Sequence, residues 1–138
     1  MRLGGLKRGW LLATLVLASC LAVSAKQLDS KAKDVIARYT QSLQHENAGV
    51  VESCIFNLMQ VKLLYPEAEF NKAMRELNRL ILDGETAAIR YKAFLAINFF
   101  DNADWQVLLE GKKQDEREEA FALLSQKVNS QLLSLNDR

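Results

Sequence analysis

Apolar side chains recur at steps of three and four residues along most of this chain, and this spacing predicts a series of helices. Asp29 or Ser30 would cap a first helix over about 30–44. Polar residues followed by Gly49 end it, and a second apolar series predicts a helix over about 48–64. The apolar positions of these two helices are Ala32, Val35, Ile36, Tyr39, Leu43, Val51, Ile55, Leu58 and Met59.

The second half of the chain continues in the same way. Pro66 suits the first turn of a third helix, which Asp83 and Gly84 end. A fourth helix, about 86–99, is apolar around most of its circumference, so we expect it to lie at the centre of the fold. A short helix over about 105–110 and a long one over about 114–135 complete the chain. The apolar stripe of the last helix suits a terminal lid and consists of Phe121, Leu124, Val128, Leu132 and Leu135.

The first 25 residues form a leader with a different pattern. Three basic residues precede an apolar run from Trp10 to Ala18, which is too short to span a bilayer and is typical of an export signal. Leu17 to Cys20 resembles the bacterial lipobox, which implies a lipid anchor on Cys20. Val23 to Ala25 instead presents the small residues that an ordinary signal peptidase requires, and cleavage there would release a chain starting at Lys26. Both alternatives predict export, to the periplasm or outside the cell or as a membrane-anchored lipoprotein.

Removal of the leader changes the charge and the cysteine content. The 18 basic residues fall to 15 against 17 acidic ones, a net charge of −2, which gives no electrostatic footprint for nucleic acid. Cys54 is then the one remaining thiol, so no disulfide within the chain is expected. About 113 residues suffice for one domain, and a single proline favours long helices. We therefore predict an all-α domain over 26–138.

An internal repeat relates the first two helices to the next two. A shift of 38 residues places the apolar residues of 32–59 on those of 70–97 without a gap. A period near 40 residues is the range of two-helix solenoid units. The expected architecture is a short α-solenoid-like stack of two antiparallel helix pairs with a C-terminal capping helix.

The second copy of this repeat resembles the HEAT-repeat family. Its residues are a proline early in one helix, Leu77-x-x-Leu80-Ile81-Leu82-Asp83 into the turn, and Ile89-Arg90-x-x-Ala93 opening the next helix. Asp83 and Arg90 match the family's turn aspartate and second-helix arginine. The first copy departs from the pattern, with His45 and Glu52 in those places, and the last 35 residues show no match. The resemblance implies a stack of helix pairs that holds partners rather than catalysing a reaction.

Two further predictions follow from the repeat and the charge pattern. Glu52 and Arg90 occupy equivalent places on stacked helices, so we expect them to form an ion pair between the repeats. Lys72, Arg75 and Arg79 share one helix face and would suit an acidic partner or lipid headgroups. Trp105 would suit a contact with a partner helix. A solvated helix face and a tryptophan that closes the core are the alternatives.

Candidate catalytic and metal-binding residues are few. His45 is the one histidine, and a nucleophile and base pair of Cys54 with His45 is less expected than a buried thiol and a solvated loop residue. Asp101 to Asp104 lacks the ligands of a calcium loop. We therefore predict no catalytic residues, metal or cofactor. The predicted function is that of a non-enzymatic protein-binding or scaffold module of the bacterial envelope, and the chain is expected to be monomeric. The alternative is a small envelope enzyme or enzyme inhibitor.

Overall fold

The computed structural model describes residues 26–136, and within them the chain is helical with no strand. The leader and its two cleavage sites, Cys20 included, lie outside the described residues. The described elements are a first helix over 26–42, α2 (Ala48–Leu64), α3 (Asn71–Asp83), α4 (Ala87–Asp101), α5 (Ala103–Gln106), the 3-10 turns η1 (Val107–Leu109) and η2 (Gln114–Glu116), and α6 (Arg117–Asn136).

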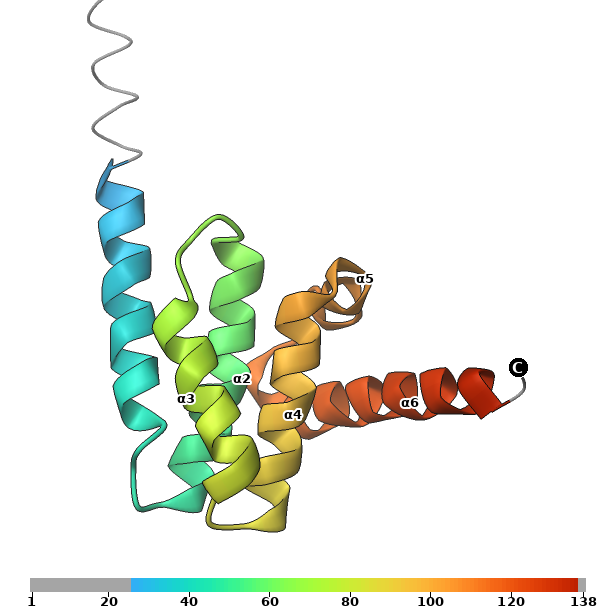
Figure 1. Ribbon diagram of the computed structural model, residues 1–138. Helices are drawn as coiled ribbons and strands as arrows, with labels where there is room; N and C mark the ends of the chain where they lie inside the picture. Colours follow the sequence, from blue (N-terminus) through green and yellow to red (C-terminus); the bar gives the residue numbers. More distant parts are fainter. Residues whose placement is uncertain (1–25, 137–138) are drawn as a thin grey trace, which may run out of the picture.

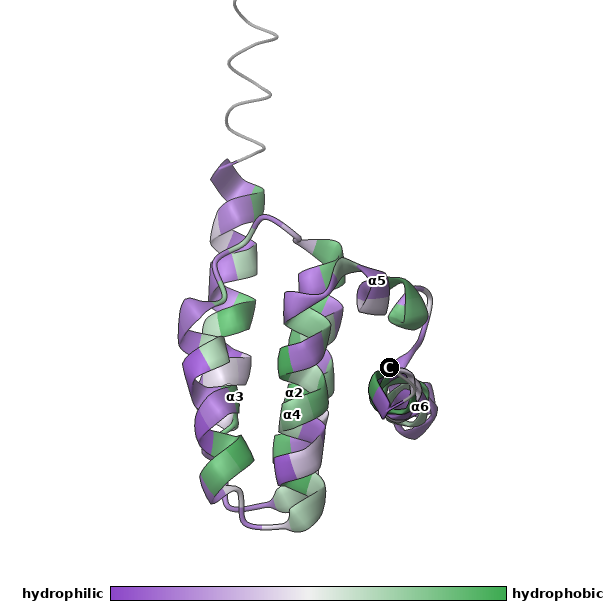
Figure 2. Cartoon of the chain, turned by 45° about the vertical axis from the view of Figure 1, so that its right-hand side comes forward, coloured by the Kyte–Doolittle hydropathy of each residue, from purple (hydrophilic) through white to green (hydrophobic). Residues whose placement is uncertain are grey.

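The four long helices before α5 form the predicted stack of two antiparallel pairs (Figure 1). Helix 26–42 pairs with α2, and α3 pairs with α4. Figure 2 shows the two layers of the stack, with helix 26–42 and α3 in one and α2 and α4 in the other. The connections within each pair lie at the same end of the molecule (Figure 1). The all-α, solenoid-like fold predicted from the sequence is therefore confirmed.

Local capping explains where two of these helices begin. The Asn47 side chain accepts a hydrogen bond from the Val50 amide at 3.2 Å, and Thr86 accepts one from the Ile89 amide at 3.1 Å. Gly84 separates α3 from α4 and is required by close packing, because a Cβ atom there would lie 2.6 Å from the Leu80 carbonyl oxygen. The tight turn brings the two helices of the pair together.

Two details of the predicted boundaries are wrong. Asp29 and Ser30 lie inside the first helix, where Asp29 forms an ion pair with Lys33 at 2.8 Å, instead of capping it. Pro66 lies in a turn before α3 rather than in its first helical turn. The loop after Pro66 brings Phe70 into the core against Phe100, with 5.1 Å between ring centroids. Burial of this ring delays the start of α3 to Asn71.

α4 lies at the centre of the fold, as its apolar circumference predicts. It packs against α2, α3, α5 and α6, and Leu95, Ala96 and Phe99 are almost completely buried. Trp105 and Leu109 close one end of the same core. None of the helices described in residues 26–136 has the length and apolar content needed to cross a membrane.

α6 runs crosswise over the α2 and α4 layer and then continues past it (Figures 1 and 2). Its first half, 117–128, contributes Ala120, Phe121 and Leu124 to the core. From Asn129 onward every described residue is exposed. The predicted lid therefore covers the core over its first half only, because the body is narrower than the helix is long.

Candidate functional site

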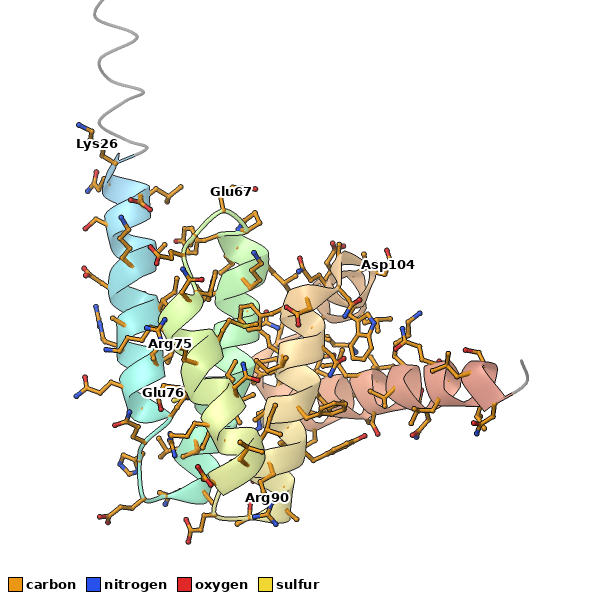
Figure 3. All side chains as sticks on the ribbon, viewed as in Figure 1. Lys26, Glu67, Arg75, Glu76, Arg90 and Asp104 are labelled. Atoms are coloured by element: carbon orange, nitrogen blue, oxygen red, sulfur yellow. The ribbon has the colours of Figure 1, made fainter. Side chains whose placement is uncertain are left out.

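The three basic residues predicted to meet an acidic partner all lie exposed on α3, and Figure 3 labels Arg75. Within residues 26–136 only Arg79 of the three forms an ion pair, with 3.0 Å between its Nε and Glu76 Oε2. The hydrogen bond from Arg79 holds the pKa of Glu76 below its ordinary value, because it favours the charged carboxylate. Lys72 and Arg75 remain as two exposed charges on the same helix. The basic face thus has one of its three charges balanced.

Trp105 is not available to a partner. Its side chain is 1% exposed, and it belongs to α5, which packs against α4. The predicted partner contact at Trp105 is therefore wrong. The ring is the largest fully buried side chain of the described residues, and its position at the end of α4 explains why: it fills the core where the helix pairs end.

The predicted ion pair between Glu52 and Arg90 is not formed. Arg90 Nη1 donates to the Gly84 carbonyl oxygen at 2.6 Å, at the loop end of the molecule (Figure 3). Glu52 instead pairs with Lys92, with 2.6 Å between Glu52 Oε2 and Lys92 Nζ. Two residues along an α-helix correspond to a rotation of about 200°, so Lys92 faces almost opposite to Arg90. An ion pair does join the two repeats, but its basic partner is Lys92 instead of Arg90.

Lys92 is the centre of a junction between three helices, which we call the Lys92 junction: Glu52 of α2, Lys92 of α4, and Glu118 and Phe121 of α6. Lys92 Nζ lies 2.8 Å and 2.9 Å from the two Glu118 carboxylate oxygens and 5.0 Å from the centroid of the Phe121 ring. The Lys92 side chain is 12% exposed. Its hydrogen bond is the largest cause of a lowered pKa at Glu118. The junction fixes α6 to both helices of the layer formed by α2 and α4.

Other contacts support the first half of α6 on either side of the Lys92 junction. Phe121 meets Phe56 of α2 edge to face, with 6.3 Å between ring centroids. Arg117 donates a hydrogen bond to Ser53 of α2. Further along, the Tyr91 hydroxyl and Ser125 Oγ are hydrogen-bonded at 2.8 Å. α6 therefore crosses α2 first and α4 second, and then leaves the body.

Cys54 and His45 differ in their exposure to solvent. Cys54 is buried in α2, and this burial raises the pKa of its thiol despite a hydrogen bond with Ser42. The His45 ring is exposed, and its Nδ1 accepts a hydrogen bond from the Asn47 amide at 3.0 Å. The two side chains thus sit in different environments. The structure agrees with a buried thiol and a solvated loop histidine.

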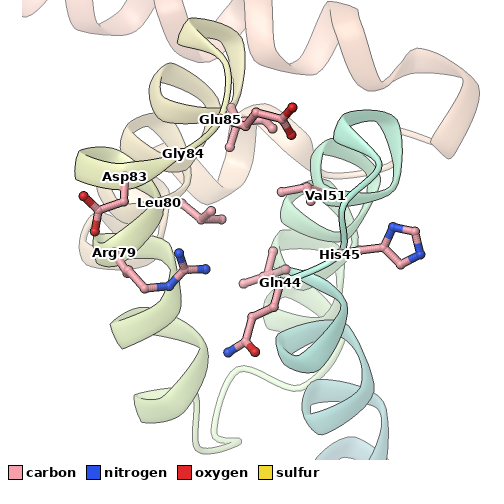
Figure 4. Close-up of a pocket in the computed structure, with 10 residues that line it drawn as sticks. Gln44, His45, Val51, Arg79, Leu80, Asp83, Gly84 and Glu85 are labelled. Carbon is pink, nitrogen blue, oxygen red and sulfur yellow. The ribbon is translucent and has the colours of Figure 1, made fainter.

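A cavity of about 150 Å³ lies where the two intra-pair loops meet (Figure 4). Leu43, Val51 and Leu80 give it apolar walls, and Gln44 and Arg79 add polar groups. His45, Asp83 and Glu85 also line it, and Figure 4 shows the His45 ring directed away from Arg79 and Asp83. No group of three or more His, Cys, Asp or Glu side chains is placed to hold a metal ion anywhere in 26–136.

A second hollow, of about 290 Å³, lies between the start of helix 26–42 and the loop after α2. Leu28, Leu64, Tyr65 and Pro66 are among the residues that line it. Leu28 and Leu64 are exposed, so the hollow is open and mostly apolar. Such walls suit apolar groups rather than acid–base chemistry.

Three exposed leucines lie close together on the second half of α6, and the sequence prediction placed two of them, Leu132 and Leu135, on the apolar stripe of a terminal lid. Leu132, Leu133 and Leu135 are 55%, 65% and 64% exposed. We call the segment 129–136 the distal half of α6. One signal in the sequence does mark it: the segment reads NSQLLSLN, with no charged residue beside its three leucines. A helix face that only meets water is normally charged.

Comparison of the chain with models of protein families, with curated proteins and with solved structures gives no match.

Proposed function

We propose that this chain is a non-enzymatic protein-binding module of the bacterial envelope, and that it binds its partner through the distal half of α6. The observation that carries the proposal is the exposure of Leu132, Leu133 and Leu135 on a helix that leaves the body. Burial of one leucine side chain stabilises a complex by about 1.5–3 kcal/mol. Three such side chains within about one turn provide a small apolar anchor.

The weak internal support of the distal half favours a docking role. Isolated helices shorter than about 12–15 residues are marginal in water, and Ser and Asn are poor helix formers. Ser130 and Ser134 direct their hydroxyls to the carbonyl oxygens of Lys127 and Gln131, which competes with regular helix bonding. Contact with a partner would supply the packing that this segment lacks.

The first half of α6 supplies the rigid support that a docking helix needs. The Lys92 junction and the Phe56 and Phe121 contact hold this half at a fixed direction on the stack. A helix held in its bound direction loses less conformational entropy on binding than a flexible one. The stack of helix pairs thus serves as a scaffold. The HEAT-like pattern of the second repeat and the export leader support a partner-holding role in the envelope.

The partner we propose is a protein with an apolar, uncharged helical surface. The distal half carries no charge, so it offers nothing to balance a charged partner, and burial of an unpaired charge against it would be unfavourable. The exposed Lys72 and Arg75 lie on α3, in the layer that α6 does not cross. Their charges would at most change the rate at which an acidic partner associates.

Site-specific photo-crosslinking in cells that express the full sequence tests this proposal. A photoreactive residue at Leu133 should give discrete cross-linked products, and the Leu132→Asp substitution should remove them. The matched control is the same photoreactive residue at Leu82, which is 78% exposed on α3. The captured protein must also bind the purified chain, more weakly after Leu132→Asp. Equal products from Leu82 and Leu133, or none from Leu133, would contradict the proposal.

A further inference from the structure

We infer that the partner bound by the distal half of α6 is a second copy of this chain, paired in an antiparallel two-fold arrangement. This inference rests on the proposed function and names the partner for the same surface. It depends on three features of the described residues: the direction of the apolar stripe on α6, an aromatic pair on α4 beside it, and the absence of charge in the distal half.

The stripe that packs on the body continues beyond it. Phe121, Leu124 and Val128 face α2 and α4, and Leu132 and Leu135 follow at the same helical spacing. The packing face of α6 therefore extends for about two turns past its own body. A second body or a second helix is required to cover these two turns.

An aromatic pair on α4 lies on the same side of α6 as Leu132. Tyr91 and Phe94 are exposed, and their rings stack with 6.2 Å between centroids. Tyr91 is hydrogen-bonded to Ser125, and Leu132 follows Ser125 by seven residues, which is two helical turns or about 10 Å along the same face. The aromatic pair and the leucines thus form the two sides of one apolar corner, where α6 leaves α4.

An antiparallel second copy fits this corner. Each body lies at the N-terminal end of its own α6, so antiparallel pairing of two distal halves keeps the two bodies apart. The end of each α6 then reaches the Tyr91 and Phe94 pair of the other copy. Such an interface is isologous, as in most two-fold homodimers.

The charge pattern favours a copy of the same chain. In a two-fold interface a charged residue close to the axis meets its own copy and repels it. The eight residues of the distal half contain no charge, so this repulsion is absent. The two-pair stack is also shorter than the three or so units that solenoids usually need. A second copy would add packing where α6 leaves the body, while the two bodies stay apart.

The surface offered is large enough for a weak dimer. The exposed fractions of Tyr91, Phe94, Leu132, Leu133 and Leu135 correspond to about 500 Å² of side-chain surface in each copy, or about 1,000 Å² for the pair. This value lies at the lower limit of specific interfaces. We therefore expect a dimer whose population depends on protein concentration.

Sedimentation equilibrium tests the inference on the chain as recovered from cells that express the full sequence. The unmodified chain should change from one copy to two as its concentration increases. The double substitution Leu132→Asp with Leu135→Asp should leave one copy at every concentration, and Leu82→Asp, the matched control, should dimerise like the unmodified chain. Circular dichroism of all three proteins confirms that each is folded.

A covalent test identifies the surface. A short bis-maleimide should link two copies of Leu132→Cys and should not link two copies of Leu82→Cys, because Leu82 lies on α3 outside the proposed interface. Cys20 and Cys54 are common to both variants, so any link through them would appear in the control as well. A single copy at every concentration together with no linked Leu132→Cys dimer would overturn the inference. If Leu133 then still captures a different protein in cells, the proposed function stands and only the choice of partner is wrong. A dimer that persists in the double aspartate variant would also overturn the inference.

Discussion

The two halves of α6 share one apolar stripe and have opposite surroundings. In the first half, Phe121 and Leu124 are buried and the Lys92 junction joins the helix to α2 and α4. In the distal half, Leu132 and Leu135 continue the same stripe and face solvent. Apolar periodicity in a sequence therefore identifies the packing face of a helix, whereas the extent of the body decides how much of that face is covered.

The largest expected difference between the halves concerns Phe121. Phe121→Ala should lower the free energy of unfolding by about 4 kcal/mol, because it removes a buried ring and leaves a cavity beside Phe56. Leu133→Ala, the matched change in the distal half, should alter it by less than about 0.5 kcal/mol. Urea unfolding followed by circular dichroism measures both values. Similar losses for the two variants would show that the distal half is packed in solution.

Loss of the Lys92 charge should have the next largest effect. Lys92→Met leaves Glu52, whose side chain is 18% exposed, without its basic partner, and should lower the free energy of unfolding by about 2 kcal/mol. Lys112→Met is the control, because Lys112 also contacts two glutamates, Glu116 and Glu119, but within one stretch of the chain. An equal effect of both substitutions in urea unfolding would contradict the joining role of Lys92.

The dependence of stability on pH gives a smaller and more specific test. The pKa of Glu118 is lowered from its ordinary value of 4.5, first by the hydrogen bond from Lys92. A carboxyl with a lowered pKa in the folded state stabilises the fold above its unfolded pKa and loses this contribution as the pH falls through the folded pKa. Glu118 is 66% exposed, so the contribution should be less than about 1 kcal/mol.

Unfolding free energies measured from neutral pH down to below pH 4.5 check this expectation. Glu118→Gln should flatten the acid part of the curve, whereas Glu110→Gln, at an exposed loop position, should leave it unchanged. If the Glu118→Gln curve ran parallel to that of the unmodified chain, the charge of Glu118 would not contribute to the stability of the fold, and the expectation would be wrong.

Hydrogen exchange should reveal the smallest energetic difference. Amides of the distal half should exchange much faster than those around Leu124, because their helical hydrogen bonds have little tertiary support. The exchange of the distal amides should become slower as the protein concentration rises, if the second copy covers them. Mass spectrometry at two concentrations measures both rates. Uniform slow exchange along α6 at the lower concentration would contradict the division into two halves.

Much of the fold could be predicted from the sequence because its signals are local. α2 has the predicted bounds, 48–64, since Asn47 is a good cap and the apolar series stops with the helix. The central position of α4 follows from its apolar circumference, because such a helix must be covered on all sides.

The errors arose where tertiary packing decides. Pro66 is compatible with a helical first turn, but the burial of Phe70 against Phe100 keeps it in a loop. The repeat aligned the helices correctly, yet a shift of two residues on α4 separates Arg90 from Lys92, and only the packed structure shows which of them faces Glu52. Trp105 is a large apolar ring, and the sequence alone does not distinguish a ring that fills the core from one that binds a partner. Leu132 and Leu135 were expected to cover the core because periodicity does not report the width of the body.

The Lys92 junction also has a consequence for the order in which the chain folds. Its bonds join residues 40 and 26 positions apart, and the Arg117 contact with Ser53 joins residues 64 positions apart. The surface on which α6 docks exists only after α2 and α4 have come together, so α6 should add to a preformed stack. Contacts that form after the transition state act mainly on the unfolding rate. Substitutions at the junction should therefore shorten the lifetime of the native state while the rate of folding changes little.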